Sequence, residues 1–239
     1  MEPDTSGRYD KEYWRFQRPI GEAGTSLDAF KFSPHVRPED VVLDFGCGGG
    51  FILSALDCSR RIGVEWGDAA RSVAADRGIE VFQWSAEVPP SSVDIVISNH
   101  ALEHAHRPLD ELRELARVLV EDGELVLVVP LDDWRKQRRP DTTDPNHHLY
   151  GWTPLLLANL CTEAGFRVRD CRILAHAWRP GFVAAQRRLP RRAYRLLTLL
   201  YSVVLRRRQI KIVCEKRRVR PQPEEYARRR ARSHAIPYS

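Results

Sequence analysis

The stretch that most constrains the fold is residues 41–50, which read VVLDFGCGGG. An apolar, β-branched run that passes directly into a glycine-rich turn is typical of a buried parallel strand leading into a helix in an α/β domain. Glycine has no Cβ atom, so the backbone of such a turn can approach a ligand closely. The stretch therefore predicts an α/β domain with a binding loop after its first strand.

Strand and helix patterns alternate downstream of this loop. The predicted strands cover 41–45, 61–65, 79–84, 93–99, 123–130, 167–178 and 208–217. The predicted helices cover 49–59, 67–78, 107–123, 153–166 and 187–208. Short, β-branched strands that alternate with helices indicate a parallel sheet covered by helices on both faces.

The 239 residues, 43% of them hydrophobic, suffice for one sizeable α/β domain with additions at its ends. We expect an N-terminal cap segment over 1–35 and the main domain over 36–216. A basic helical insertion is expected at 181–208, inside the main domain. A basic tail is expected at 217–239.

Positive charge is concentrated near the C-terminus. Residues 187–239 hold 17 Lys or Arg against three Glu, a net charge of +14, whereas the whole chain carries +6. Such a segment suits a polyanion or an anionic membrane surface, and a solvated Arg-rich end is the alternative. The apolar run within 187–208 is about half the ~20 residues that a bilayer span requires.

The cysteines and the N-terminus indicate the compartment. Five cysteines form an odd set without a CxxC pair, and the first residues are acidic and polar rather than those of a secretory signal. We therefore expect a cytoplasmic protein, held at the inner face of the membrane if 187–208 binds lipid.

The glycine loop fits one cofactor-binding pattern and fails two others. A dinucleotide G-x-G-x-x-G pattern would need glycine at Phe51, and a phosphate-binding P-loop would need a nearby lysine. LDFGCGGG instead fits D-x-G-x-G-x-G, and over residues 36–176 the chain resembles the class I S-adenosylmethionine-dependent methyltransferases. The resemblance implies a doubly wound, mostly parallel seven-stranded sheet with an antiparallel closing strand.

The resemblance also implies S-adenosyl-L-methionine as the cofactor and assigns roles to residues. Gly46, Cys47 and Gly48 would line its methionine portion, and Asp44 would support the loop. Glu65 would accept both ribose hydroxyls, since a carboxylate suits a diol. The adenine would lie near Trp66, Ser85 and Ala86, and the loop after the fourth strand would add Asn99 and His100. No reactivity is expected of Cys47.

Histidines point to the acceptor side of the site. Five of the eight lie in NHALEHAHRP and DPNHHLYGWTP, the loops expected at the carboxyl edge of the sheet. Histidine suits proton removal near neutral pH, and His148 is the first candidate for a general base, with His104 and His147 as alternatives. No H-E-x-x-H pairing is present and no H-x-x-x-H pair falls within a predicted helix, so no metal site is expected.

The acceptor is indicated by pattern alone. DPNHHLYGWTPLLLANLCTEAGF is similar to a feature of bacterial methyltransferases of polysaccharide or cell-envelope assembly, which suggests methylation of a sugar or other small hydroxyl acceptor. Tyr150, Trp152 and Trp134 are candidates for stacking on a sugar. Nucleic-acid methylation is disfavoured, since SNHALEH lacks [DNS]-P-P-[YFW], and a SAM-binding scaffold without chemistry remains the third hypothesis. Segment 187–208 would contact a membrane or a second subunit of a homodimer.

Overall fold

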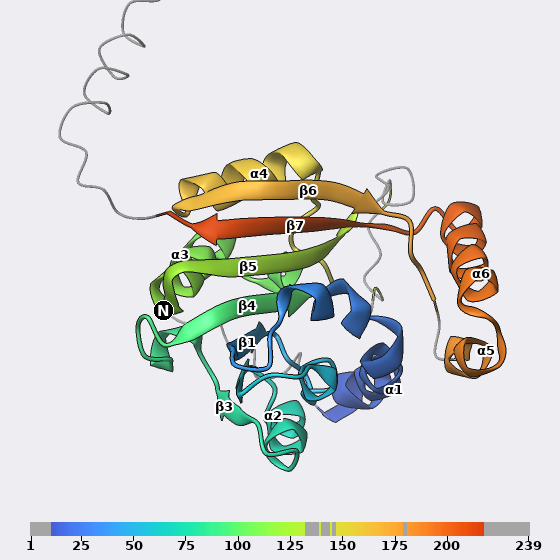
Figure 1. The fold of residues 1–239 in the computed structure, drawn as a ribbon, viewed down its shortest axis with the longest axis horizontal. Coiled ribbons are helices and arrows are strands. Elements are labelled where there is room, and N and C mark those ends of the chain that lie inside the picture. Colours follow the sequence, from blue (N-terminus) through green and yellow to red (C-terminus); the bar gives the residue numbers. More distant parts are fainter. Residues whose placement is uncertain (1–10, 132–138, 140–143, 145–146, 179–180, 218–239) are drawn as a thin grey trace, which may run out of the picture.

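A seven-stranded sheet forms the centre of the protein, with strand order β3-β2-β1-β4-β5-β7-β6 (Figure 1). The computed structural model describes residues 11–131, 139, 144, 147–178 and 181–217. The strands are β1 (Val41–Phe45), β2 (Arg60–Val64), β3 (Glu80–Phe82), β4 (Val93–Asn99), β5 (Leu119–Leu131), β6 (Phe166–Leu174) and β7 (Arg208–Lys216).

The strand directions confirm the predicted doubly wound sheet. β1 pairs in parallel with β2 and β4, β2 with β3, and β4 with β5. β7 runs antiparallel to both β5 and β6, which makes it the closing strand. The order reverses direction beside β1, so ligands are expected beyond the carboxyl ends of β1, β2 and β4.

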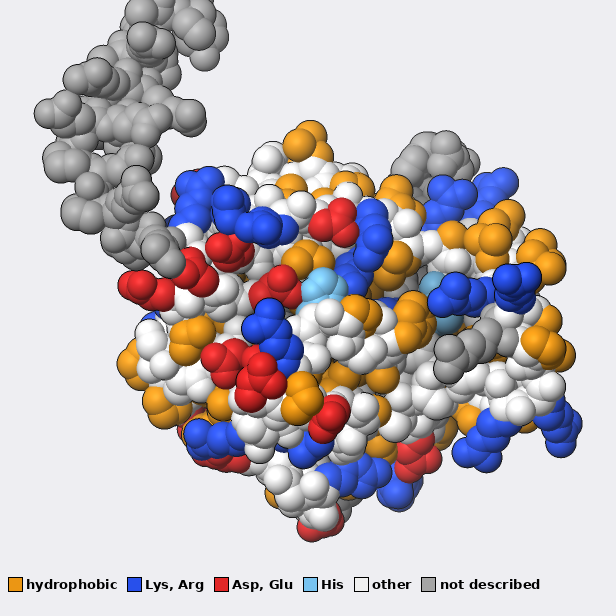
Figure 2. Space-filling model, in the orientation of Figure 1, with side chains coloured by type: hydrophobic (Ala, Val, Ile, Leu, Met, Phe, Trp, Pro, Cys, Tyr) orange, Lys and Arg blue, Asp and Glu red, His pale blue; other side chains and the backbone are white. Residues whose placement is uncertain are grey.

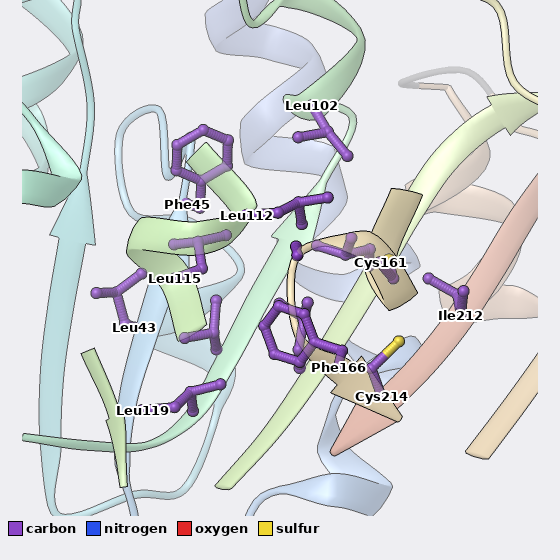
Figure 3. Packing of buried hydrophobic residues seen from close by; sticks show 14 of the residues in the cluster. Leu43, Phe45, Leu102, Leu112, Leu115, Leu119, Cys161, Phe166, Ile212 and Cys214 are labelled. Atoms are coloured by element: carbon purple, nitrogen blue, oxygen red, sulfur yellow. The ribbon is translucent and has the colours of Figure 1, made fainter. Parts of the chain in front are cut away.

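Two hydrophobic layers cover the two faces of the sheet. Alternate residues of β5 divide between them, with Leu125 and Leu127 in one cluster and Val126 and Val128 in the other. The first cluster lies under α3 (Pro108–Val118) and α4 (Pro154–Glu163), as Figure 3 shows. The second lies under α2 (Asp68–Ala75). The sheet that carries the loops is therefore buried on both faces.

The helix predicted over 49–59 is wrong. The structure has a single 3-10 turn there, Leu53–Ala55, and β2 starts at Arg60. The Arg61 guanidinium donates to the carbonyl oxygens of Leu53 (3.2 Å) and Leu56 (2.7 Å), groups that a longer helix would have satisfied itself. A side chain of β2 thus replaces the missing helical hydrogen bonds.

The helix predicted over 107–123 is shorter than expected. α3 ends at Val118, because the N–H groups of Ser91 and Ser92 donate to the carbonyl oxygens of Arg117 and Val118. The chain enters β5 at once. These bonds tie the end of the helix to the loop before β4.

The basic insertion 181–208, in which the sequence predicts one helix over 187–208, contains two helices, α5 (Phe182–Arg188) and α6 (Arg191–Val204), which lie beyond the end of the sheet (Figure 1). Pro190 separates them, because proline keeps the preceding Leu189 extended. Within the described residues, no helix combines the length and the apolar run needed to span a bilayer. Of the predicted tail 217–239, residues 218–239 lie outside the described residues.

A buried ion pair joins the N-terminal segment to the sheet. α1 (Lys11–Leu27) leads into Asp28 and Lys31, whose charged atoms lie 2.7 Å apart and are almost fully buried. The Lys31 ammonium also donates to Oδ1 of Asn99 at the end of β4 (3.2 Å), and Trp178 Nε1 donates to Asp28 (2.9 Å). Burial alone would raise the pKa of Asp28, but the Lys31 charge and hydrogen bonds from His176, Lys31 and Trp178 hold it well below its usual range.

We predict that Lys31→Met lowers the free energy of unfolding by about 3–5 kcal/mol, since it leaves the Asp28 carboxylate buried without its counter-charge. The double variant Asp28→Asn with Lys31→Met should lose less than Lys31→Met alone. Urea unfolding of the wild type and both variants measures this. Equal or greater destabilisation of the double variant would contradict the assignment.

Candidate functional site

A cavity of about 700 Å³ opens at the carboxyl edge of the sheet. The glycine loop and the ends of β2 and β4 form its floor, α1 closes one side, and residues around the start of β7 close another. This is the switch point of the strand order. If the prediction is right, the residues assigned to the cofactor side and those assigned to the acceptor side should line this one cavity.

The glycine loop folds back onto the end of β2. The N–H groups of Gly46 and Cys47 donate to the carbonyl oxygen of Val64 at 2.8 and 3.1 Å. Gly46 has φ +74°, and a Cβ atom there would lie 2.3 Å from that of Ala101. Gly48 has φ +54° but nothing within 4 Å of its Cβ position, so the space beside it belongs to the cavity.

Glu65 connects the two sides of the cofactor region. Oε2 accepts a hydrogen bond from the Gly48 N–H, and Oε1 accepts one from the Gly67 N–H, both at 2.8 Å. Burial raises the pKa of Glu65, and these two bonds oppose part of the rise. A carboxylate has about four acceptor positions, so both oxygens retain capacity for a diol.

Asp44 and Cys47 lie beneath the loop. Asp44 is 3% exposed and borders the cavity, and both burial and the nearby Glu65 carboxylate raise its pKa. Burial and the same two carboxylates raise the pKa of the Cys47 thiol. A thiol held protonated is a poor nucleophile, in agreement with the expectation that Cys47 is unreactive.

The adenine side is less complete than predicted. Trp66 lines the cavity and packs edge-on against Phe45, with ring centroids 6.1 Å apart. Ser85 and Ala86 are outside the cavity lining, and the Ser85 hydroxyl donates to Glu111 at 2.6 Å. The structure therefore does not bring Ser85 or Ala86 to the cofactor region, because the turn after β3 directs the Ser85 hydroxyl toward α3.

The acceptor side is an edge rich in histidine. Asn99, His100, His104 and His148 line the cavity, and the rings of His104 and His148 lie 5.2 Å apart, edge to face. Burial lowers the pKa of His104, so its imidazole is neutral near neutral pH. His147 is exposed, has φ +47° and lies outside the cavity lining, so the structure does not bring it to the site.

The aromatic residues predicted to stack on a sugar lie elsewhere. Tyr150 and Trp152 stack on each other with centroids 5.7 Å apart, and Trp152 is buried in the main core. Neither lines the cavity. Trp134 lies outside the described residues.

Two groups of lining residues were missed from sequence. α1 contributes Trp14, whose ring stacks on Phe51 of the glycine loop, with centroids 6.2 Å apart. The turn before β7 contributes Arg206 and Arg207, and the first residue of β7 contributes Arg208. From the sequence, these arginines were expected at the C-terminal end of the predicted helix 187–208. They reach the cavity because β7 pairs with β5 in the sheet.

Comparison with known proteins identifies the family. The family described as a methyltransferase domain matches residues 13–170, well over half of the chain. The chain belongs to the methyltransferase domain family. The match begins at residue 13 and so covers most of α1, whereas the resemblance seen in the sequence began only at residue 36.

Individual relatives are distant. The chain is 30% identical over 140 residues to the uncharacterized methyltransferase YcgJ of Bacillus subtilis, covering 54% of this chain and 55% of that protein. It is 24% identical over 141 residues to "Probable tRNA methyltransferase 9B" of Bos taurus, covering 56% and 30%. The chain thus spans about half or less of the curated relatives that it matches.

Solved structures of the same fold support the architecture. A chain of the complex between the Haloferax volcanii Trm112 methyltransferase activator and a methyltransferase superposes with a TM-score of 0.62 at 17% identity, over 87% of this chain and 97% of that chain. S-adenosylmethionine is the cofactor of the family. The open space at Gly48, the Glu65 carboxylate and the Trp66 ring fit its methionine, ribose and adenine portions.

We predict that Glu65→Ala weakens S-adenosylhomocysteine binding by about 1.5–3 kcal/mol, because the charged acceptor of the ribose is lost. Glu65→Gln should lose less, since it keeps one acceptor oxygen. Calorimetry measures both, with the exposed Glu80→Ala on β3 as the matched control. Equal affinity for the wild type and Glu65→Ala would remove Glu65 from the ribose site.

Proposed function

We propose that the protein is an S-adenosylmethionine-dependent methyltransferase that methylates a hydroxyl of a sugar or other small envelope-related acceptor. The carrying observation is that the glycine loop with Glu65 and the edge formed by His104 and His148 border the same cavity. A methyl donor and an acceptor can therefore meet in it. Catalysis would follow largely from holding the two reactants in line.

The reaction needs a lone pair and an exit for one proton. The acceptor oxygen forms a bond to the methyl carbon, the carbon–sulfur bond breaks, and its electron pair stays on sulfur as S-adenosylhomocysteine forms. The hydroxyl proton passes to an imidazole nitrogen of His104 or His148. His104 and His148 are the residues that we propose to activate the hydroxyl, because both border the cavity and His104 is neutral near pH 7.

The three arginines at the start of β7 favour an acidic acceptor. Arg206, Arg207 and Arg208 are exposed and line the cavity, and no carboxylate of the described residues pairs with them. Guanidinium groups bind phosphate through charge-assisted hydrogen bonds. A sugar phosphate, a nucleotide sugar or a lipid-linked sugar has both the hydroxyl and the anionic group.

A tRNA is the second candidate acceptor. One relative is named for tRNA methylation, and the same arginines would suit a phosphate backbone. The two candidates differ in size and in salt dependence. A nucleic-acid acceptor would lose affinity steeply as salt rises, whereas a small phosphorylated sugar would engage few phosphates.

We predict that methyl transfer from labelled S-adenosylmethionine occurs to phosphorylated sugars or nucleotide sugars rather than to tRNA. His148→Ala should lower kcat by about 10²–10⁴, with S-adenosylhomocysteine affinity unchanged, because His148 acts on the acceptor. His106→Ala, an exposed neighbour outside the cavity, is the matched control. Transfer to tRNA alone, or an unaltered kcat in His148→Ala, would contradict this assignment.

The α5–α6 segment also supports contact with a membrane that carries such an acceptor. α6 exposes an apolar surface made of Leu196, Leu199, Leu200, Val203 and Val204. Figure 2 shows hydrophobic and basic side chains gathered together over α5 and α6. An amphipathic helix with basic flanks can lie in the interface of an anionic bilayer. A second subunit is the alternative occupant of this surface.

We predict that the protein sediments with anionic vesicles and not with neutral ones, and that Leu200→Glu reduces the bound fraction. Leu155→Glu, at an exposed position on α4, is the matched control and should bind like the wild type. Equal recovery with both vesicle types, or none with either, would exclude the membrane role. Light scattering would then test for a homodimer.

A further inference from the structure

We infer that Glu103, His104 and His148 form a binding site for a divalent transition-metal cation at the acceptor end of the cavity. The residues come from the 3-10 turn Leu102–His104 and from the loop before α4. Their side-chain ligand atoms all lie within 4.8 Å of one another. Ligands held by one cation at about 2.1 Å are at most about 4.2 Å apart, so small side-chain rotations would close the site.

Glu103 is the observation that points to a ligand. Its side chain is fully buried, and among the described residues neither carboxylate oxygen has a hydrogen-bond partner. His100 Nδ1 lies 3.3 Å from Oε1 but does not complete a hydrogen bond. Burying a carboxylate without a hydrogen bond, with only the His100 imidazole at ion-pair distance, is costly, and a cation coordinated by Glu103 would compensate that charge.

The backbone holds the three ligands in place. The N–H groups of Leu149 and Tyr150 donate to the carbonyl oxygen of Glu103 at 2.9 and 3.3 Å. These bonds fix the loop that carries His148 directly against the turn that carries Glu103 and His104. The site is therefore organised by main-chain contacts that do not depend on the cation.

The donor set selects the class of metal. Two imidazoles and one carboxylate suit Zn²⁺, Mn²⁺, Fe²⁺ or Co²⁺, whereas Mg²⁺ and Ca²⁺ prefer oxygen ligands. Three protein ligands leave coordination positions open, and all three residues border the cavity. An acceptor with two adjacent oxygens, such as a sugar diol, could chelate the cation there.

The role of the cation rests on the proposed function, although its binding does not. A hydroxyl bound to the cation is more acidic, so its proton would pass to water and the oxygen lone pair would attack the methyl carbon. With the cation bound, His104 and His148 would act on the hydroxyl through the metal, as its ligands, instead of taking the proton themselves. The sequence predicted no metal because its histidines lack a helical pairing, whereas this site joins residues that only the fold brings together.

Titration of tag-free, metal-stripped protein with Co²⁺, without S-adenosylmethionine, tests the inference. We expect one Co²⁺ per chain, with the visible absorption of histidine-bound Co²⁺. Glu103→Gln and His148→Ala should each weaken Co²⁺ binding by more than about tenfold, and the exposed His106→Ala should bind like the wild type. Absence of the absorption in the wild type, or equal weakening in His106→Ala, would overturn the site.

S-adenosylhomocysteine calorimetry on the same samples separates this inference from the proposed function. Glu103→Gln should bind the product with nearly the wild-type affinity, which also shows that the variant is folded. If the wild type binds S-adenosylhomocysteine but not Co²⁺, only the metal site is overturned. If the wild type binds Co²⁺ but not S-adenosylhomocysteine, the metal site stands and the methyltransferase role is overturned.

Discussion

The cofactor side of the cavity depends on one carboxylate. Glu65 accepts backbone N–H groups from Gly48 in the glycine loop and from Gly67 before α2, which fixes the loop relative to the end of β2. A glycine-rich loop has high conformational freedom when unfolded, so it needs such an anchor to present one shape to a ligand. The residue expected to bind ribose therefore also organises the loop that is expected to bind the methionine portion of the cofactor.

The acceptor side is organised by contacts between distant segments. The buried pair of Asp28 and Lys31 reaches Asn99 at the end of β4, and the carbonyl oxygen of Glu103 holds the loop of His148. Both sets of contacts converge on the turn after β4, between Asn99 and His104. Cofactor positioning and acceptor chemistry are thus supported by separate interactions, which explains why variants can be designed to affect one and leave the other.

Sequence predicted the parts of the site that follow local rules. The alternation of strands and helices and the glycine loop follow from hydrophobic patterns, and the resemblance to the class I methyltransferases implied the doubly wound seven-stranded sheet and the role of Glu65. The sequence did not predict the burial of Glu103, because nothing in the residues Leu102–His104 alone indicates that the carboxylate is shielded from water. The fold buries it completely. The sequence ranked His148 ahead of His147 but did not predict that His147 lies outside the cavity, since two adjacent residues in a loop take different directions only after the loop is bound to Glu103. The 3-10 turn in place of a helix at 49–59 depends on Arg61, a contact from the next strand.

The central claim is that one cavity holds the methyl donor at Glu65 and presents its methyl group to the edge formed by His104 and His148. A crystal structure with bound S-adenosylhomocysteine tests this most directly. The account predicts both ribose hydroxyls within hydrogen-bonding distance of the Glu65 carboxylate and the sulfur directed toward His104 and His148. A product molecule bound away from Glu65, or one whose sulfur faces away from both histidines, would contradict it.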